Sequence, residues 1–354
     1  MLDRSDRDGG LARKLLDRMP EMTRDRHGML AFENARRNAP LIGRGKSIAA
    51  LRAAPVGAGD RALVIAAGPS IRRRETLRAV AQRGFEGAVI ATESAMRGCL
   101  QNGIVPDLVV TLDPHVTRIV RWFGDPALTH EALERDDYFR RQEQDDGFAN
   151  ELAANEEILA LLDAHGSRIR IALSTSASEA VVDRVFGCGM DVYWWNPMLD
   201  DPDDADGMTA CLMAENGLPC INAGGNVGTA AWMMATEVLE KRTVGLTGMD
   251  FGYYSDTNYE NTQYYAEAVD LVGENGLDSL FVRFDTPHYG EGSWFYTDPA
   301  YLWYRECFLE LASDSDARTV NCTEGGILFG PGIDIRPLSE YLGDRTVAAT
   351  VAGD

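Results

Sequence analysis

The stretch that decides the fold is Ala62-Leu63-Val64-Ile65-Ala66-Ala67-Gly68-Pro69-Ser70. Its first six residues are all apolar, which is typical of a strand that is covered on both faces. Gly68 and Pro69 end this strand in a turn, and a helix is expected from about residue 72 to residue 82, ending at Gly84. A buried strand followed by a tight turn and a helix is the first half of a βαβ unit.

The same alternation of short buried strands and helices continues along the chain. Further strands are expected at residues 88–91, 107–112, 169–173, 191–194, 244–246 and 319–322. Helices are expected at residues 93–100, 178–186, 229–239, 302–311 and 338–342. This spacing predicts βαβ units, and therefore an α/β fold with a mostly parallel sheet and helices on both faces.

Changes in composition along the chain predict its organisation. Residues 1–59 are rich in arginine and carry apolar residues at helical spacing, which predicts a helical N-terminal extension. Residues 60–345 are expected to form the α/β domain. Within it, the charged residues 116–165 predict a helical insertion, and the polar residues 252–300 predict a lid-like loop. Residues 346–354 are expected to form a flexible tail.

The composition excludes several classes of protein. The 354 residues are 45% hydrophobic and 25% charged, which are ordinary values for a globular chain. The formal net charge of −21 repels phosphate backbones, so no nucleic-acid partner is expected. The sequence contains no run of about 18 apolar residues, so no membrane span is expected. The charged N-terminus and the six scattered cysteines favour a cytoplasmic protein. No histidine lies at zinc-ligand spacing from a cysteine, so no metal ligands are assigned.

Ligands of open parallel sheets bind beyond the carboxyl ends of the strands. The segments with suitable composition there are residues 68–70, 112–114, 222–228 and 248–254. The turn Gly68-Pro69-Ser70 brings backbone N–H groups and a hydroxyl to the start of a helix, which suits a phosphate or a carboxylate. A plain strand–helix turn is the alternative interpretation of this motif.

The turn Asn222-Ala223-Gly224-Gly225-Asn226-Val227-Gly228-Thr229 is more informative. Its three glycines allow a ligand to approach the backbone closely, and Asn222, Asn226 and Thr229 add directional hydrogen bonds. At a helix N-terminus this composition predicts a nucleotide or phosphate site, with a tightly packed helix–strand junction as the alternative. The turn lacks the pattern G-x-G-x-x-G, so a nicotinamide cofactor is not indicated.

Several side chains could carry acid–base chemistry. Asp113 and Asp250 each end a strand, where a carboxylate can hold a ribose hydroxyl, a metal or an acceptor hydroxyl, or can cap the next segment. His288 in the long polar loop is the first candidate for a general base, and His115 is the second. The loop also offers hydroxyls and stacking faces from Tyr253, Tyr254, Tyr259, Tyr264, Tyr265 and Tyr289.

These segments, in this order, resemble a known family. Residues 66–71 resemble its entry motif G-x-G-P-S-L, and residues 91–114 resemble its most specific block, with Asn102-Gly103-Ile104-Val105-Pro106-Asp107 followed by Asp113-Pro114. Its later blocks are matched by Gly224-Gly225-Asn226-Val227, Gly248-Met249-Asp250-Phe251 and Thr323-Glu324-Gly325-Gly326. The family joins the motility accessory factor glycosyltransferases, which put nonulosonic acids on flagellin, to the archaeal 6-hydroxymethyl-dihydropterin diphosphokinases. It is also distantly similar to bacterial sialyltransferases.

The resemblance covers roughly residues 60–345 and implies a Rossmann-like domain that binds an activated nucleotide. The positions expected to contact the nucleotide or its phosphate are Gly68, Pro69, Ser70, Glu93, Asp113, Asn222, Gly224, Gly225, Asn226, Thr229, Tyr259, Tyr289, Glu324, Gly325 and Gly326. Catalytic roles are expected for His288, Asp250, Tyr253 and Tyr254. The sialyltransferases carry a catalytic histidine as the second of an H-Y-x-x-H arrangement, and Gly292 stands at that place here.

Three functions follow from these observations. The leading hypothesis is a cytoplasmic transferase that passes the sugar of a nucleotide-activated donor, a CMP-linked nonulosonic acid, to a hydroxyl of a small molecule or protein. The second is a diphosphokinase that moves pyrophosphate from ATP to a hydroxymethyl pterin, with Mg²⁺ held by carboxylates such as Asp113 and Asp250. The third is a nucleotide- or sugar-binding module without catalysis, which Gly292 suggests. An oligomer is compatible with each of them.

Overall fold

The computed structural model of this protein describes residues 10–115, 121–129, 131 and 151–343. Its centre is a ten-stranded sheet with the order β1-β6-β5-β4-β3-β2-β8-β12-β13, and β7 pairs with the end of β6. The strands are β1 (Lys46–Ser47), β2 (Arg61–Ile65), β3 (Ala88–Thr92), β4 (Leu108–Thr111), β5 (Arg170–Ser174), β6 (Asp191–Pro197), β7 (Cys220–Ile221), β8 (Thr243–Thr247), β12 (Arg318–Asn321) and β13 (Ile333–Ile335). Neighbouring strands run parallel, which confirms the predicted α/β fold.

Successive residues of the central strands pack against opposite layers of helices. In β2, Val64 packs with one layer and Leu63 with the other, and both side chains are fully buried. The first layer holds α13 (Val227–Met233), η7 (Met234–Val238) and α15 (Pro299–Asp314). The second holds α5 (Thr76–Arg83), α6 (Glu93–Gln101), α10 (Glu151–His165), α11 (Glu179–Gly187) and α16 (Leu338–Leu342). Burial on both faces is why these strands are continuous apolar runs.

The strand order reverses between β2 and β8, so the loops that follow these two strands lie next to each other. Ile65 at the end of β2 is in register with Thr247 at the end of β8. The loop after β2 leads into the short helix α4 (Ser70–Arg73), and the loop after β8 carries Asp250. Such a switch point is where open α/β sheets form a crevice for ligands.

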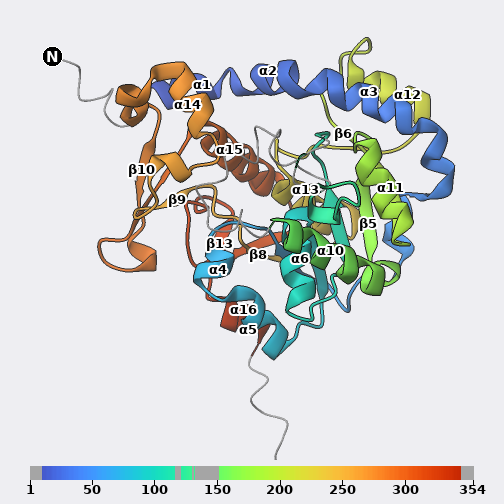
Figure 1. Cartoon of the computed structure of the whole chain (residues 1–354). Coiled ribbons are helices and arrows are strands. Elements are labelled where there is room, and N and C mark those ends of the chain that lie inside the picture. Colours follow the sequence, from blue (N-terminus) through green and yellow to red (C-terminus); the bar gives the residue numbers. More distant parts are fainter. Residues whose placement is uncertain (1–9, 116–120, 130, 132–150, 344–354) are drawn as a thin grey trace, which may run out of the picture.

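The N-terminal segment crosses one edge of the molecule as a series of helices (Figure 1). These are α1 (Gly10–Leu16), α2 (Met19–Thr23), the π-helix η2 (Arg24–Gly28) and α3 (Met29–Asn38). The segment then forms η3 (Ala39–Arg44), β1 and η4 (Ile48–Ala53). The predicted helical extension therefore also contributes an edge strand, because Lys46 and Ser47 pair with Tyr193 and Trp194 of β6.

Two buried asparagines fix α3 to the loops that follow β4 and β5. The Nδ2 atom of Asn34 donates to the carbonyl oxygens of Pro114 and Ser176, at 3.0 and 2.9 Å. The Nδ2 atom of Asn38 donates to the carbonyl oxygens of Thr175 and Ala177, at 2.8 and 2.7 Å. Both side chains supply partners to carbonyl groups that no strand or helix satisfies, and they hold the N-terminal helices over the ends of the strands.

Residues 252–300, expected to be a lid-like loop, contain regular structure. A second sheet has the order β10-β11-β9, with β9 (Tyr253–Tyr254), β10 (Val282–Asp285) and β11 (Trp294–Thr297) running antiparallel. The helix α14 (Tyr265–Val272) and the turns η8 (Tyr259–Asn261), η9 (Glu274–Ser279) and η10 (Pro287–Tyr289) complete the segment. Cross-strand aromatic packing, such as Phe295 against Tyr254, holds a sheet that is too short to show clear sequence periodicity.

The remaining elements include η6 (Gly166–Arg168) and α12 (Met208–Asn216). The predicted helical insertion at residues 116–165 contains α10, whereas residues 116–120, 130 and 132–150 lie outside the described part of the chain, as does the predicted tail at 346–354. Among the described residues, no helix combines the length and the apolar character needed to cross a membrane.

Replacement of Asn38 by alanine should lower the free energy of unfolding by about 1–3 kcal/mol, because the buried carbonyl group of Thr175 loses its side-chain donor and that of Ala177 keeps only the bond from Arg37. Urea unfolding followed by circular dichroism measures this change. The control is Asn102→Ala, which removes an exposed amide that bonds to Gly98 in its own helix, and a shift below about 0.5 kcal/mol is expected there. Equal shifts in the two variants would contradict the anchoring role of Asn38.

Candidate functional site

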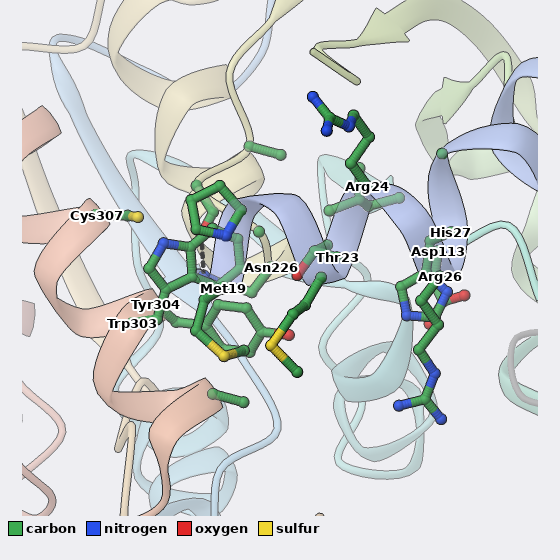
Figure 2. Close-up of a pocket in the computed structure, with 18 of the residues that line it drawn as sticks. Met19, Thr23, Arg24, Arg26, His27, Asp113, Asn226, Trp303, Tyr304 and Cys307 are labelled. Carbon is green, nitrogen blue, oxygen red and sulfur yellow. Dashed lines mark hydrogen bonds between the residues drawn. The ribbon is translucent and has the colours of Figure 1, made fainter. Parts of the chain in front are cut away.

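A cavity of about 940 Å³ lies between the ends of the strands and the N-terminal helices. Its floor is formed by residues that follow β3 to β7, its roof by residues 15–31, and its side wall by α14 and α15 (Figure 2). The polar and aromatic lining residues include Arg24, Arg26, His27, Glu93, Asp113, Asp200, Asn222, Asn226, Tyr264, Glu267, Asp298, Trp303, Tyr304, Glu310 and Asp314. The roof is thus made by the segment that the sequence suggests only as an extension.

Two carboxylates lie in the floor of the cavity. Asp113 follows β4, and its Oδ1 atom accepts a hydrogen bond from the backbone N–H of His115 at 2.9 Å. Glu93 is the first residue of α6; the residue is only 3% exposed, and its buried Oε2 atom has no hydrogen-bond partner among the residues that the structure describes. Burial, with a smaller contribution from the negative charge of Asp113, raises the pKa of Glu93 to about 8.

The asparagine–glycine turn also lines the cavity, but its polar atoms bond within the turn. Asn226 caps α13 by accepting from the backbone N–H of Thr229 at 2.9 Å, and its Nδ2 atom donates to the hydroxyl of Thr229 at 2.8 Å. Asn222 accepts from the N–H of Gly224 at 3.0 Å. Gly225 has a φ angle of +79°, and a Cβ atom there would collide with the ring of Trp303. The close approach that Gly225 permits is therefore to the side wall of the cavity.

The roof places two guanidinium groups and an imidazole above the floor. Arg24, Arg26 and His27 all belong to the π-helix η2, a widened helical turn of a kind often found at functional sites. Arg26 pairs with Glu267 of α14 at 3.2 Å, and the Nδ1 atom of His27 lies 2.9 Å from the Nε2 atom of His115. These contacts connect the roof to the wall and to the floor.

Asp250 lies at the switch point and holds the ends of two neighbouring strands together. Its Oδ2 atom accepts from the hydroxyl of Ser70 at 2.7 Å, and its Oδ1 atom accepts from the backbone N–H of Ser70 at 3.2 Å. The side chain is 2% exposed, and burial raises its pKa to about 7. A Cβ atom on Gly68 would collide with this carboxylate, so the glycine leaves room for Asp250.

The loop after β12 packs against the same aspartate. The backbone N–H of Ile327 donates to the carbonyl oxygen of Asp250 at 2.8 Å, and a side chain at Gly326 would collide with that backbone. A side chain at Gly325 would collide with the hydroxyl of Tyr254. Glu324 has a φ angle of +54°, a strained conformation for a residue with a Cβ atom. We call the group formed by Gly68, Ser70, Asp250, Tyr254 and residues 324–326 the switch-point cluster.

Pro69 is the residue directly before α4, next to Ser70 of this cluster. Arg73 of α4 places its guanidinium 4.1 Å from the centre of the Tyr254 ring and forms two hydrogen bonds with Asp256. The cluster therefore has a positive charge nearby, and this charge is already paired.

The other tyrosines and the histidine proposed for the site have separate surroundings. Tyr253 is buried and donates its hydroxyl to Asp298 at 2.7 Å, and Tyr259 donates to Asp278 at 3.0 Å. The Nδ2 atom of Asn321 donates to the hydroxyl of Tyr289 at 3.4 Å. His288 is exposed, and its ring packs against Tyr289 and Phe329; partial burial lowers its pKa.

The structure thus divides the candidate residues into two groups. Glu93, Asp113, Asn222, Gly224, Gly225 and Asn226 line the cavity, with Thr229 directly behind Asn226. The residues that do not line it are Gly68, Pro69, Ser70, Asp250, Tyr253, Tyr254, Tyr259, His288, Tyr289, Glu324, Gly325 and Gly326. Ser70 and Asn226 therefore do not face one shared space, and the ligand contacts assigned to both groups remain predictions.

Sequence reasoning missed the roof and wall of the cavity. Arg24, His27, Trp303 and Tyr304 lie in segments that show only helical periodicity, and nothing local indicates that they face one cavity. The three basic side chains Arg24, Arg26 and His27 do not stand out locally, because arginines recur throughout residues 1–59.

Among the residues that the structure describes, no group of three or more histidine, cysteine, aspartate or glutamate side chains could hold a metal ion. The Mg²⁺ ligands suggested for a diphosphokinase are not neighbours in one cavity, because Asp113 lines the cavity and Asp250 is bonded to Ser70 outside its lining.

Comparison with known proteins confirms the resemblance inferred from the sequence. Residues 33–124 match the sequence model of a family described as 6-hydroxymethylpterin diphosphokinase MptE-like. The matched segment runs from α3 through β4 and includes Glu93 and Asp113. No curated protein matches the chain.

One solved structure that is similar is a motility accessory factor (MAf) glycosyltransferase from Magnetospirillum magneticum AMB-1. The two chains share 18% sequence identity, with a TM-score of 0.48. The match covers 81% of this chain but only 34% of the other, so this chain corresponds to about a third of the length of that protein.

The buried carboxyl of Asp250 predicts a characteristic dependence of stability on pH. Its folded-state pKa of about 7 lies above the usual value of 3.8, so the folded protein binds a proton that the unfolded chain releases between these values. The stability that this proton contributes is fully present below pH 3.8 and is lost as the pH rises towards 7.

Between pH 4 and pH 7, the free energy of unfolding of the natural protein should therefore fall relative to that of Asp250→Asn by up to about 1.4 kcal/mol per pH unit. Chemical denaturation across this range measures the difference. The variant Asp256→Asn, which removes an exposed carboxylate, serves as the control. Parallel curves for the natural protein and Asp250→Asn would show that Asp250 is ionised throughout.

Proposed function

We propose that the cavity binds a nucleotide-activated donor and that the protein is a glycosyltransferase-like enzyme. The donor in this proposal is a CMP-linked nonulosonic acid, and the acceptor is a hydroxyl group of a small molecule or a protein. The observation that carries the proposal is the cavity itself, which combines guanidinium groups, aromatic rings and carboxylates at the ends of parallel strands. The resemblance to the family supports a transferase that uses an activated nucleotide.

The cavity offers a separate partner for each part of such a donor. Trp303 and Tyr304 of α15 lie on one side of it, where their rings can stack on a nucleobase, and Arg26, His27 and Asp113 lie on the other (Figure 2). Arg24 and Arg26 supply guanidinium groups of the kind that bind phosphate oxygens. The sugar would then extend over the floor towards Glu93 and Asp113.

The charge of the lining favours a CMP-linked sugar over ATP. Among the residues that the structure describes, seven carboxylate side chains line the cavity, namely Glu93, Asp113, Asp200, Glu267, Asp298, Glu310 and Asp314, together with the two arginines Arg24 and Arg26. A donor with one phosphodiester and one carboxylate meets less repulsion there than a triphosphate. The diphosphokinase alternative would need bound cations to offset this charge.

Thermal unfolding in the presence of CMP, CMP-N-acetylneuraminate, ATP and ATP with Mg²⁺ tests the donor. CMP and its sugar conjugate should raise the Tm, because a ligand at about 100 times its Kd contributes about 2.7 kcal/mol to the folded state. Release of CMP from the conjugate should follow. Stabilisation only by ATP with Mg²⁺ would instead support the diphosphokinase, and binding of CMP without release would support a binding module.

The variant Arg24→Ala should weaken CMP binding by about tenfold or more, since a charge-assisted hydrogen bond to phosphate is lost. The matched control is Arg78→Ala, which removes an exposed arginine of α5 that pairs with Glu75 outside the cavity lining. Titration calorimetry measures both affinities. Equal affinities in the two variants would remove Arg24 from the phosphate site.

A further inference from the structure

Asp113 presents an accessible carboxylate oxygen at the floor of the cavity. The residue follows β4, is half-buried and lines the cavity. Its Oδ1 atom accepts a hydrogen bond from the backbone N–H of His115 at 2.9 Å, which fixes the orientation of the carboxyl group. Its Oδ2 atom has no hydrogen-bond partner within the described part of the chain, and this atom is not shielded from solvent. One oxygen therefore holds the side chain in place while the other is available to a ligand.

Four other carboxyl groups of the lining differ from Asp113 in this respect. Both oxygens of Asp298 accept hydrogen bonds from the protein, as do both oxygens of Asp200. Glu267 of α14 forms an ion pair with Arg26. The Oε2 atom of Glu93 is shielded from solvent. These side chains have a structural partner or an inaccessible oxygen, whereas Oδ2 of Asp113 is accessible and unpaired in the described part of the chain.

The place of Asp113 in the cavity matches the place expected for the reacting carbon. Two further carboxylates of the lining, Glu310 and Asp314, stand on α15, the helix whose aromatic rings form the opposite side of the cavity. Asp113 lies on the side of Arg26 and His27 (Figure 2). In a nucleotide-activated sugar, the anomeric carbon is joined directly to a phosphate oxygen. A phosphate bound by the guanidinium of Arg26 therefore brings this carbon to the side of the cavity that holds Asp113.

We infer that Oδ2 of Asp113 accepts the proton of the hydroxyl group that attacks the donor, so that Asp113 is the general base of the transfer. This inference rests on the proposed function. The acceptor oxygen forms a bond to the anomeric carbon, and its proton passes to Oδ2. The bond between the anomeric carbon and the phosphate oxygen breaks, and its electron pair leaves with CMP. A carboxylate can act as the base because the attacking hydroxyl becomes more acidic as its bond to the anomeric carbon forms.

A purely structural role for Asp113 would use only the bond to His115, which shapes the loop after β4. The two roles can be separated with asparagine, because its side-chain oxygen still accepts from a backbone N–H but the amide does not take up a proton. The variant Asp113→Asn should therefore keep the loop and the fold, with a Tm within about 2 °C of that of the natural protein.

The test measures the release of CMP from CMP-N-acetylneuraminate at pH 7 with water as the acceptor. We expect Asp113→Asn to lower turnover at least about 100-fold, as for the loss of a general base, while the Kd for CMP changes by less than about threefold. The variant Asp113→Glu keeps a carboxylate one methylene group further from the backbone, and it should recover part of the activity that Asp113→Asn loses.

The matched control is Asp125→Asn. The Oδ1 atom of Asp125 accepts from the backbone N–H of Ala127 at 2.9 Å, which is the same local bond that Asp113 makes to His115, and Asp125 is also half-buried. Asp125 does not line the cavity, so turnover within about threefold of that of the natural protein is expected for this variant.

The possible outcomes separate the inference from the proposed function. Nearly full turnover in Asp113→Asn would overturn the inference and leave the donor proposal standing. Equal losses of turnover in Asp113→Asn and Asp125→Asn would also overturn it, because the effect would then come from the turn. Loss of CMP binding together with turnover in Asp113→Asn would make Asp113 a binding residue instead of the base. A natural protein that binds no CMP and releases none would overturn both proposals.

Discussion

The pair formed by Asp250 and Ser70 is the contact on which the arrangement of the loops depends. It joins the loop after β2 to the loop after β8 at the point where the strand order reverses, and the loop after β12 packs on the same aspartate. The carboxylate is out of contact with water, so its two hydrogen bonds to Ser70 replace solvation that it loses on folding. Gly68 and Gly326 are needed because any side chain there would occupy the space of Asp250.

The cavity depends on a second set of contacts, which hold the N-terminal helices over the ends of β4 and β5. The amides of Asn34 and Asn38 bond to carbonyl groups in the loops that follow these strands. The roof residues 15–31 close the cavity above the ends of these strands. The shape of the cavity is thus a consequence of the way the first forty residues pack.

The comparison of sequence and structure is most instructive at the glycines. Their clustering after strands predicts close approach to the backbone, and the structure shows that approach at Gly68, Gly225 and Gly325. At these three positions the neighbouring group is a side chain of the protein, namely the carboxylate of Asp250, the ring of Trp303 and the hydroxyl of Tyr254. Sequence alone shows that a glycine is required, but it does not show whether a ligand or the protein fills the space.

The sequence by itself determined the central strands β2 to β6, β8 and β12 and their parallel arrangement, because a strand buried on both faces must be apolar throughout and this pattern is local. It also placed Asp113 at the end of a strand and Glu93 at the start of a helix. Only the tertiary structure decided which of the strand-end residues share a cavity, since Glu93, Trp303 and the roof residues 15–31 are brought together by packing between distant segments. Such convergence leaves no periodic signal in any one segment, and the protonation of Glu93 depends on burial that only the assembled fold provides.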